Sequence, residues 1–172
     1  DFNLKKFSVK AEYDTIQSFI LKDSVFYLMK KQKNIDLVNS NFEILQSIEA
    51  DSIITNTPGN YFILCRNTKK ILTNPYLLIY PNEFDNIYTS TYYNDIEYIL
   101  VERNLKLGIV NQKGEIIIPL KYDNAYQYFS EYIDGILYFN LILDNKLYII
   151  NTKGKVIKKT SVNNYYLLQK KN

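Results

Sequence analysis

The chain has 172 residues and a formal net charge of +3, and 47% of its residues are hydrophobic and 15% aromatic. This length and composition suit one globular domain with a substantial core, and no apolar run approaches the roughly 18 residues that a membrane-spanning helix requires. Because the chain has no histidine and only one cysteine, it lacks the Ser/His and Cys/His catalytic systems, His-ligated metal sites and any internal disulfide.

Four aspartates introduce similar phrases along the chain and reveal a tandem repeat. They are Asp14, Asp51, Asp85 and Asp123, at spacings of 37, 34 and 38 residues. A period near forty residues is typical of a chain built from one repeated supersecondary unit. We predict a single β-repeat domain over residues 1–172, with units at 10–47, 48–81, 82–119 and 120–159 and partial flanking strands at 1–9 and 160–172.

Each unit is predicted to contain short strands joined by hairpin turns. Apolar blocks rich in β-branched and aromatic residues predict one long strand per unit, at residues 25–29, 61–65, 96–101 and 136–143. Every block ends in a polar tip that suits a hairpin turn. The next strand stops at Asn111 or Asn151, where Asn-x-x-Gly predicts a tight loop with a left-handed glycine.

Two units depart from this turn pattern. Phe42 stands where Gly114 and Gly154 stand in the later units, so we expect Asn41 to carry the left-handed backbone. The second unit is degenerate, with Asn74-Pro75 at the place of the turn.

A short final strand follows each turn, and we expect it to end at Pro81 or Pro119, because proline cannot donate to a strand ladder. Helical periodicity is nearly absent, although residues 14–21 allow one helical turn. The fold class predicted is all-β, with three to four short antiparallel strands per unit. The units form either a small propeller-like ring, closed by the two terminal strands, or an open twisted array.

The repeated phrases resemble the bacterial WG-repeat family. Residues 106–114 read Lys-Leu-Gly-Ile-Val-Asn-Gln-Lys-Gly, and residues 119–123 read Pro-Leu-Lys-Tyr-Asp. The family is named for a Trp-Gly pair before the Asn-x-x-Gly turn; here Leu107 and Gly108 stand at that pair, and the chain has no tryptophan. The resemblance implies tandem β-hairpins with a binding or scaffolding role and no catalytic residues to carry over.

We therefore expect a non-enzymatic module that mediates protein–protein interaction, with another protein as its partner. The alternative is a secreted or surface-attached module that binds glycan or peptide with exposed tyrosines, since the chain has 17 of them. No cofactor, metal, nucleic acid or membrane-spanning segment is expected, and the sequence leaves binding residues and oligomeric state open. A leader ahead of Asp1 would indicate secretion or the cell envelope, and its absence the cytoplasm.

Other kinds of chemistry have weaker support. Asp95 with Glu97, or Glu131 with Asp134, could pair as acid and base, but nothing in their spacing is specific. The basic run at 153–159, with lysines and tyrosines near the C-terminus, is more typical of solvated turns than of a nucleic-acid surface.

The repeated aspartates suggest the hypothesis of a calcium site. Each unit supplies only one, whereas Ca²⁺ takes six to eight oxygen ligands. We predict instead that Asp85 and Asp123 are structural and cap the turn that follows the Pro-x-x-aromatic corner.

Overall fold

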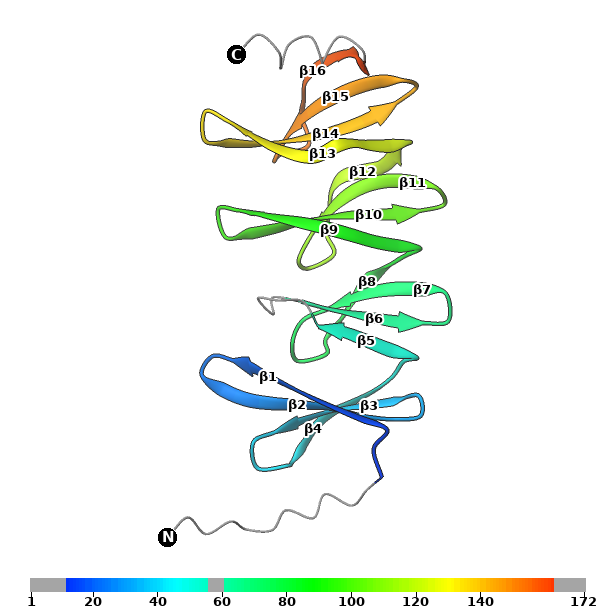
Figure 1. The fold of residues 1–172 in the computed structure, drawn as a ribbon, viewed down its shortest axis with the longest axis vertical. Helices are drawn as coiled ribbons and strands as arrows, with labels where there is room; N and C mark the ends of the chain where they lie inside the picture. Colours follow the sequence, from blue (N-terminus) through cyan, green and yellow to red (C-terminus); the bar gives the residue numbers. More distant parts are fainter. Residues whose placement is uncertain (1–11, 56–60, 163–172) are drawn as a thin grey trace. The chain divides into compact units, whose positions relative to one another are not determined.

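The computed structural model describes residues 12–55 and 61–162, and this part of the chain is built almost entirely from β-strands. The strands form four antiparallel sheets of four strands each, and every sheet takes four strands that follow one another along the chain (Figure 1). No sheet closes on itself. The predicted all-β fold of about four tandem units is confirmed.

All four sheets have the same internal order, with their first and fourth strands at the edges. The first sheet contains β1 (Thr15–Leu21), β2 (Ser24–Lys31), β3 (Asn34–Asn39) and β4 (Ile44–Glu49). The second contains β5 (Ser52–Thr55), β6 (Phe62–Arg66), β7 (Lys69–Thr73) and β8 (Ile79–Phe84). The third contains β9 (Asn86–Tyr93), β10 (Ile96–Arg103), β11 (Lys106–Asn111) and β12 (Ile116–Tyr122). The fourth contains β13 (Asn124–Ile133), β14 (Ile136–Leu143), β15 (Lys146–Asn151) and β16 (Val156–Ser161).

The two inner strands of each sheet supply most of the core. In the third sheet, β10 and β11 are buried along most of their length, whereas the edge strand β9 has no buried position. A strand that is covered on both faces appears in the sequence as a continuous run of apolar residues. The inner strands are therefore the elements that the sequence predicts best.

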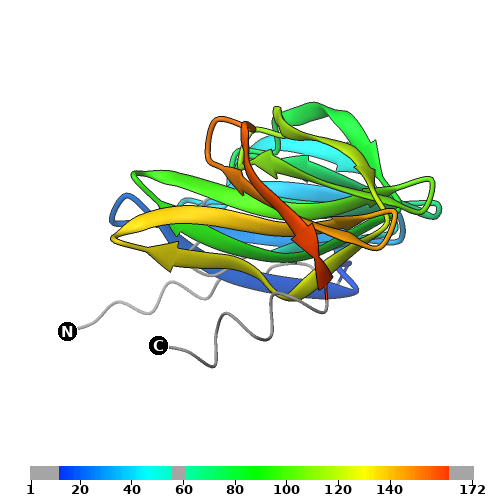
Figure 2. The same ribbon diagram turned by 90° about the horizontal axis from the view of Figure 1, so that it is seen from above.

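The chain divides into two compact units, residues 1–67 with 73–79 and residues 68–72 with 80–172. In the second unit the third and fourth sheets share one core, made by Tyr98, Leu100, Leu107, Ile109, Ile118, Tyr122, Leu137, Phe139, Leu141 and Ile150. Two of these rings, Tyr98 of β10 and Phe139 of β14, have centroids 5.1 Å apart. Strands within a sheet are twisted relative to one another, as Figure 2 shows for the fourth sheet in yellow to red.

An asparagine begins the tight turn between the third and fourth strands of every sheet. In each turn its side-chain oxygen accepts hydrogen bonds from the backbone N–H groups two and four residues later, at 2.9–3.0 Å. The four residues are Asn39, Asn74, Asn111 and Asn151. The second of the four repeat units, which is degenerate in sequence, thus keeps the turn, with Leu77 at the left-handed φ of 61°.

The prediction for the first turn was wrong. Phe42 itself adopts the left-handed backbone, with φ of 63°, and Asn41 does not. The Phe42 ring stacks on Tyr27 with centroids 5.2 Å apart, and its N–H donates to the Asn39 carbonyl at 3.0 Å. These contacts offset a conformational cost of roughly 1–2 kcal/mol.

The expected ends of the short final strands were also wrong. β8 continues past Pro81, and β12 continues past Pro119. Both are edge strands, where a proline can face away from the ladder without removing a hydrogen bond. Residues 15–21 likewise form β1 and no helical turn, because they pair with β2 along their whole length.

The predicted ring would be closed by the two terminal strands, which involve mainly residues 1–11 and 163–172, and these lie outside the described residues. It stays a prediction.

The asparagine turn gives a first testable expectation. Asn151→Ala removes the acceptor of two backbone N–H groups, at Lys153 and Lys155, and should lower the free energy of unfolding by about 1–2 kcal/mol. Asn151→Asp should change it little, because a carboxylate accepts the same two bonds beside two lysines. Urea denaturation measures both, and an equal loss in the two variants would show that the side-chain acceptor does not stabilise the turn.

Candidate functional site

Each repeated aspartate lies at the junction that leads into a sheet. Asp14, Asp51, Asp85 and Asp123 directly precede β1, β5, β9 and β13. Each carboxylate accepts a backbone hydrogen bond, at 2.5–2.9 Å, from the turn that joins the second and third strands of its sheet. The donor is the N–H of the first residue of that turn: Gln32, Asn67, Asn104 and Asp144 in the four sheets. Each aspartate N–H donates at 2.7–2.8 Å to a carbonyl at the end of the second strand, those of Lys30, Cys65, Glu102 and Ile142.

The aspartates therefore have a structural contact, but the predicted turn was wrong. No turn follows the corner, because Asp85 is the single residue between β8 and β9, and Asp123 the single residue between β12 and β13. The capped turn lies 19 residues further along the chain for Asp85. In the part of the chain that the structure describes, no three acidic or cysteine residues gather as a metal site would require.

Three of the junction aspartates also bind a lysine of the preceding sheet. Lys33 Nζ lies 3.3 Å from Asp51 Oδ1, Lys106 Nζ lies 2.5 Å from Asp123 Oδ1, and Lys69 pairs with Asp85. The pKa of Asp123 is lowered from its ordinary 3.8, chiefly by the hydrogen bond from Lys106 and then by that from the Asp144 N–H. The pKa of Asp85 is lowered in the same way, chiefly by Lys69.

These lowered pKa values predict acid sensitivity. A carboxyl whose pKa is lower in the folded than in the unfolded protein stabilises the fold fully above the unfolded value, and this contribution is lost as the pH falls through the folded value. The melting temperature should therefore fall between about pH 5 and pH 3. Asp123→Asn keeps an acceptor for the Asp144 N–H and should flatten this dependence with a small loss at pH 7.

Asp123→Ala should lower the melting temperature at pH 7 more than Asp123→Asn does. Differential scanning calorimetry at several pH values measures both effects. An unchanged acid profile in Asp123→Asn would contradict the assigned contact.

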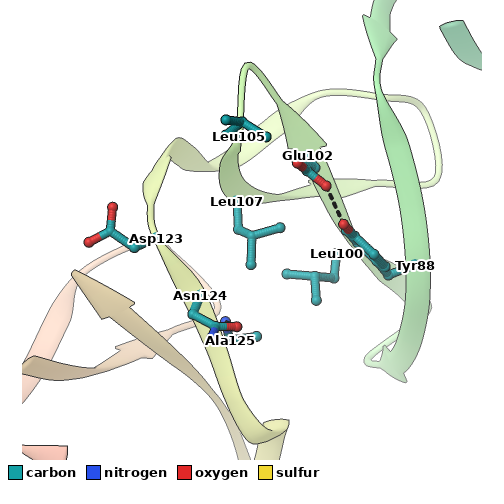
Figure 3. Close-up of a pocket in the computed structure, with 8 residues that line it drawn as sticks. All are labelled: Tyr88, Leu100, Glu102, Leu105, Leu107, Asp123, Asn124 and Ala125. Carbon is teal, nitrogen blue, oxygen red and sulfur yellow. Dashed lines mark hydrogen bonds between the residues drawn. The ribbon is translucent and has the colours of Figure 1, made fainter. Parts of the chain in front are cut away.

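A groove with a volume of about 340 Å³ lies between the third and fourth sheets, within the second compact unit (Figure 3). It is lined by Tyr88, Leu100, Glu102, Leu105, Leu107, Asp123, Asn124 and Ala125. Figure 3 shows Leu100 and Leu107 pointing into the space between the strands, whereas the Asp123 carboxylate points away from it. The groove thus has an apolar floor and a polar rim.

Glu102 is the charged group that the groove presents. Its Oε2 accepts a hydrogen bond from Asn86 Nδ2 at 3.0 Å and another from the Tyr88 hydroxyl (Figure 3). The Asn86 side chain is oriented by Lys70 Nζ, which donates to Asn86 Oδ1 at 3.0 Å. The pKa of Tyr88 is raised, chiefly by its hydrogen bond to Glu102, so the phenol stays protonated and keeps donating.

The first compact unit contains an equivalent groove of about 290 Å³ between β1, β2, β3 and the start of β5. The two grooves are related by the repeat, at an offset of 72 residues: Leu28, Ile35, Asp51 and Ile53 stand in one where Leu100, Leu107, Asp123 and Ala125 stand in the other. The apolar floor and the aspartate are common to both. The rim is not, because Lys30 occupies the position of Glu102.

The residue whose carbonyl accepts from the junction aspartate is the variable position of the repeat. It is Lys30, Cys65, Glu102 and Ile142 in the four sheets. One backbone role is thus filled by a cation, a thiol, an anion and an alkyl side chain. Sequence reasoning did not single out Glu102 or Tyr88, although comparing repeats for a position that changes its chemistry within a constant frame would have found Glu102.

The other sequence candidates lie on strands and turns of the third and fourth sheets, with Glu131 on β13. Asp95 accepts from the Tyr92 hydroxyl at 3.1 Å, and Glu97 from Ser90 at 2.6 Å, so each is held by β9. Asp134 lies in the turn between β13 and β14 at φ of 50°. From the basic run, Lys159 lies 4.8 Å from the centroid of the Tyr148 ring, and the residues near the C-terminus lie outside the described part.

Among the described tyrosines of the second compact unit, Tyr88, Tyr92 and Tyr132 are more than half exposed. Their hydroxyls all donate within the protein: Tyr132 to the Tyr92 carbonyl at 2.7 Å, and the other two to carboxylates. They present ring faces, with the hydroxyls already engaged. Within the residues described, no helix is long and apolar enough to span a bilayer.

No protein-family model and no curated protein matches the chain. Among solved structures, Hsv2p of Kluyveromyces lactis is similar with a TM-score of 0.34 and 13% identity, over 84% of this chain and 50% of that one. A variant of the same protein with its loop 6CD replaced by a Gly-Ser linker gives 0.35 and 12%, over 77% and 46%. A Bacteroides caccae protein of unknown function gives 0.35 and 11%, over 81% and 57%. The chain thus spans about half the length of these structures, and the likenesses are too distant to bear on function.

Proposed function

We propose that the chain is a non-enzymatic β-repeat module that mediates protein–protein interaction through the groove between the third and fourth sheets. The groove is lined by aliphatic side chains with one oriented carboxylate and one aromatic ring at its rim. An apolar floor with a few placed polar groups is the usual composition of a binding site. The resemblance to WG repeats, itself a proposal, implies the same kind of role.

The observation that carries this proposal is the recurrence of the groove. The floor and the junction aspartate are kept in both compact units, while the charged rim residue changes from Lys30 to Glu102. A constant frame with one variable contact residue is how repeat proteins vary what they bind. A purely structural cavity gives no reason for the variable residue to lie at the rim.

The exposed tyrosines support a second candidate, a glycan- or peptide-binding surface on a secreted or surface-attached protein. Tyrosine rings supply contact area at low entropic cost. A sugar-binding surface would also use their hydroxyls, and those of Tyr88, Tyr92 and Tyr132 donate internally. We therefore favour a protein partner.

Photo-cross-linking from the groove rim tests the proposal. Leu105 lies at the rim with 82% of its surface exposed and takes a photoreactive phenylalanine without loss of core packing. The matched control places the same group at Ile157, which is 52% exposed on β16. The partner that is captured through the group at position 105 is purified on its own and titrated by calorimetry into the unmodified chain.

Ala125→Ile gives the corresponding prediction. Isoleucine already occupies this repeat position as Ile53 in the other groove, so the larger side chain should fill the floor and leave the melting temperature within a few degrees. Affinity for the partner should fall roughly five-fold or more, while Ile53→Ala should leave it unchanged. Equal affinity of Ala125→Ile and the parent, or a carbohydrate as the captured species, would contradict the proposal.

A further inference from the structure

We infer that the groove between the third and fourth sheets recognises a lysine or arginine side chain of the partner, through Glu102. This inference rests on the proposed function and names the chemistry of the residue that the groove takes. Three features carry it: the state of the Glu102 carboxylate, the shape of the floor, and the contrast with the equivalent groove.

The Glu102 carboxylate is oriented but not neutralised. Both of its hydrogen bonds, from Asn86 and Tyr88, reach Oε2, and among the described residues no lysine or arginine lies within ion-pair distance of it. Neutral donors hold a carboxylate in place without removing its charge. Oε1 therefore remains available to an incoming cation.

Asp123, the other acid of the groove, does not compete for that cation. Its Oδ1 binds Lys106 at 2.5 Å, and its Oδ2 accepts from the Asp144 N–H at 2.9 Å. Its charge is compensated, and Figure 3 shows it turned away from the Tyr88–Glu102 pair. The uncompensated negative charge of the groove belongs to Glu102.

The floor suits the aliphatic part of a long basic side chain. Leu100 and Leu107 are 6% and 8% exposed and lie beside Ala125 along the groove. Lysine and arginine bury their methylene stems on apolar surface while the charged end reaches a polar group. A stem along the leucines would bring the cation to the rim where Glu102 is fixed.

The equivalent groove provides a contrast within the same chain. Its floor is also aliphatic, but Lys30 stands at the position of Glu102, and Lys30 is close enough to contribute to lowering the pKa of Asp51. A cationic side chain would be repelled there. The two grooves should therefore discriminate between partner residues of opposite charge.

Three synthetic peptides test the inference. They share an acetylated and amidated Ser-Thr-Ser-X-Ser-Thr-Ser frame, with X as lysine, norleucine or glutamate, and are titrated into the ¹⁵N-labelled chain while the amide signals of Leu107 and Ala125 are followed. The lysine peptide should bind roughly two- to five-fold more tightly than the norleucine peptide, as expected for a partly exposed ion pair. The amides of Ile35 and Ile53, in the other groove, report any non-specific binding.

Two variants separate charge from shape. Glu102→Gln keeps acceptors for Asn86 and Tyr88 and should abolish the preference for lysine over norleucine without weakening the norleucine peptide. Glu102→Lys copies Lys30 and should shift the preference to the glutamate peptide. Unchanged melting temperatures show that both variants are folded.

The outcomes distinguish this inference from the proposed function. Equal binding of the lysine and norleucine peptides, with both weakened by Ala125→Ile, would overturn the role of Glu102 and leave the groove as a binding site. A lysine preference that survives in Glu102→Gln would also overturn it. If no peptide shifts the signals of the groove, both the inference and the proposed groove fail.

Discussion

The hydrogen bonds of the junction aspartate are the constraint on which the repeat depends. The Asp85 side chain holds the turn at Asn104, and its backbone N–H holds the carbonyl of Glu102. Together they fix the start of β9 against the end of β10. This contact sets the register at the start of β9, where Asn86 lies opposite Glu102 and Ile87 opposite Val101. The pairing shifts before Ser90, which lies opposite Ile99, so the aspartate fixes the first residues of β9 and with them the place of Asn86 beside Glu102.

The sequence predicted the strands and the repeat because both depend on local pattern. The inner strands appear as apolar blocks. The side chain of the asparagine that begins each final turn bonds to residues no more than four positions away, as Asn111 does to Lys113 and Glu115. The partners of the aspartates could not be predicted in this way. Asp123 bonds to a residue 21 positions away, and only the folded hairpin brings the two together. Phe42 shows the same limit, because its left-handed backbone is supported by Tyr27 on another strand.

The groove was missed for a related reason. Its lining comes from β9, β10, β11 and the start of β13, and each residue alone reads as an ordinary strand position. The informative comparison runs between repeats. Lys30, Cys65, Glu102 and Ile142 differ in charge and polarity while serving one backbone position, which separates what the fold requires from what it leaves open.

Strand pairing within consecutive segments has a consequence for how such chains change in number of units. Every described strand pairs only with strands of its own sheet, and every sheet is a continuous stretch of chain. Recombination that duplicates or deletes one whole unit therefore leaves no strand without its ladder partner. The new boundary between units then needs only a lysine that forms an ion pair with the aspartate of the next unit, as Lys106 does with Asp123. Each added unit would also bring its own copy of the variable residue, so the number of grooves and their order of charges can be inherited together.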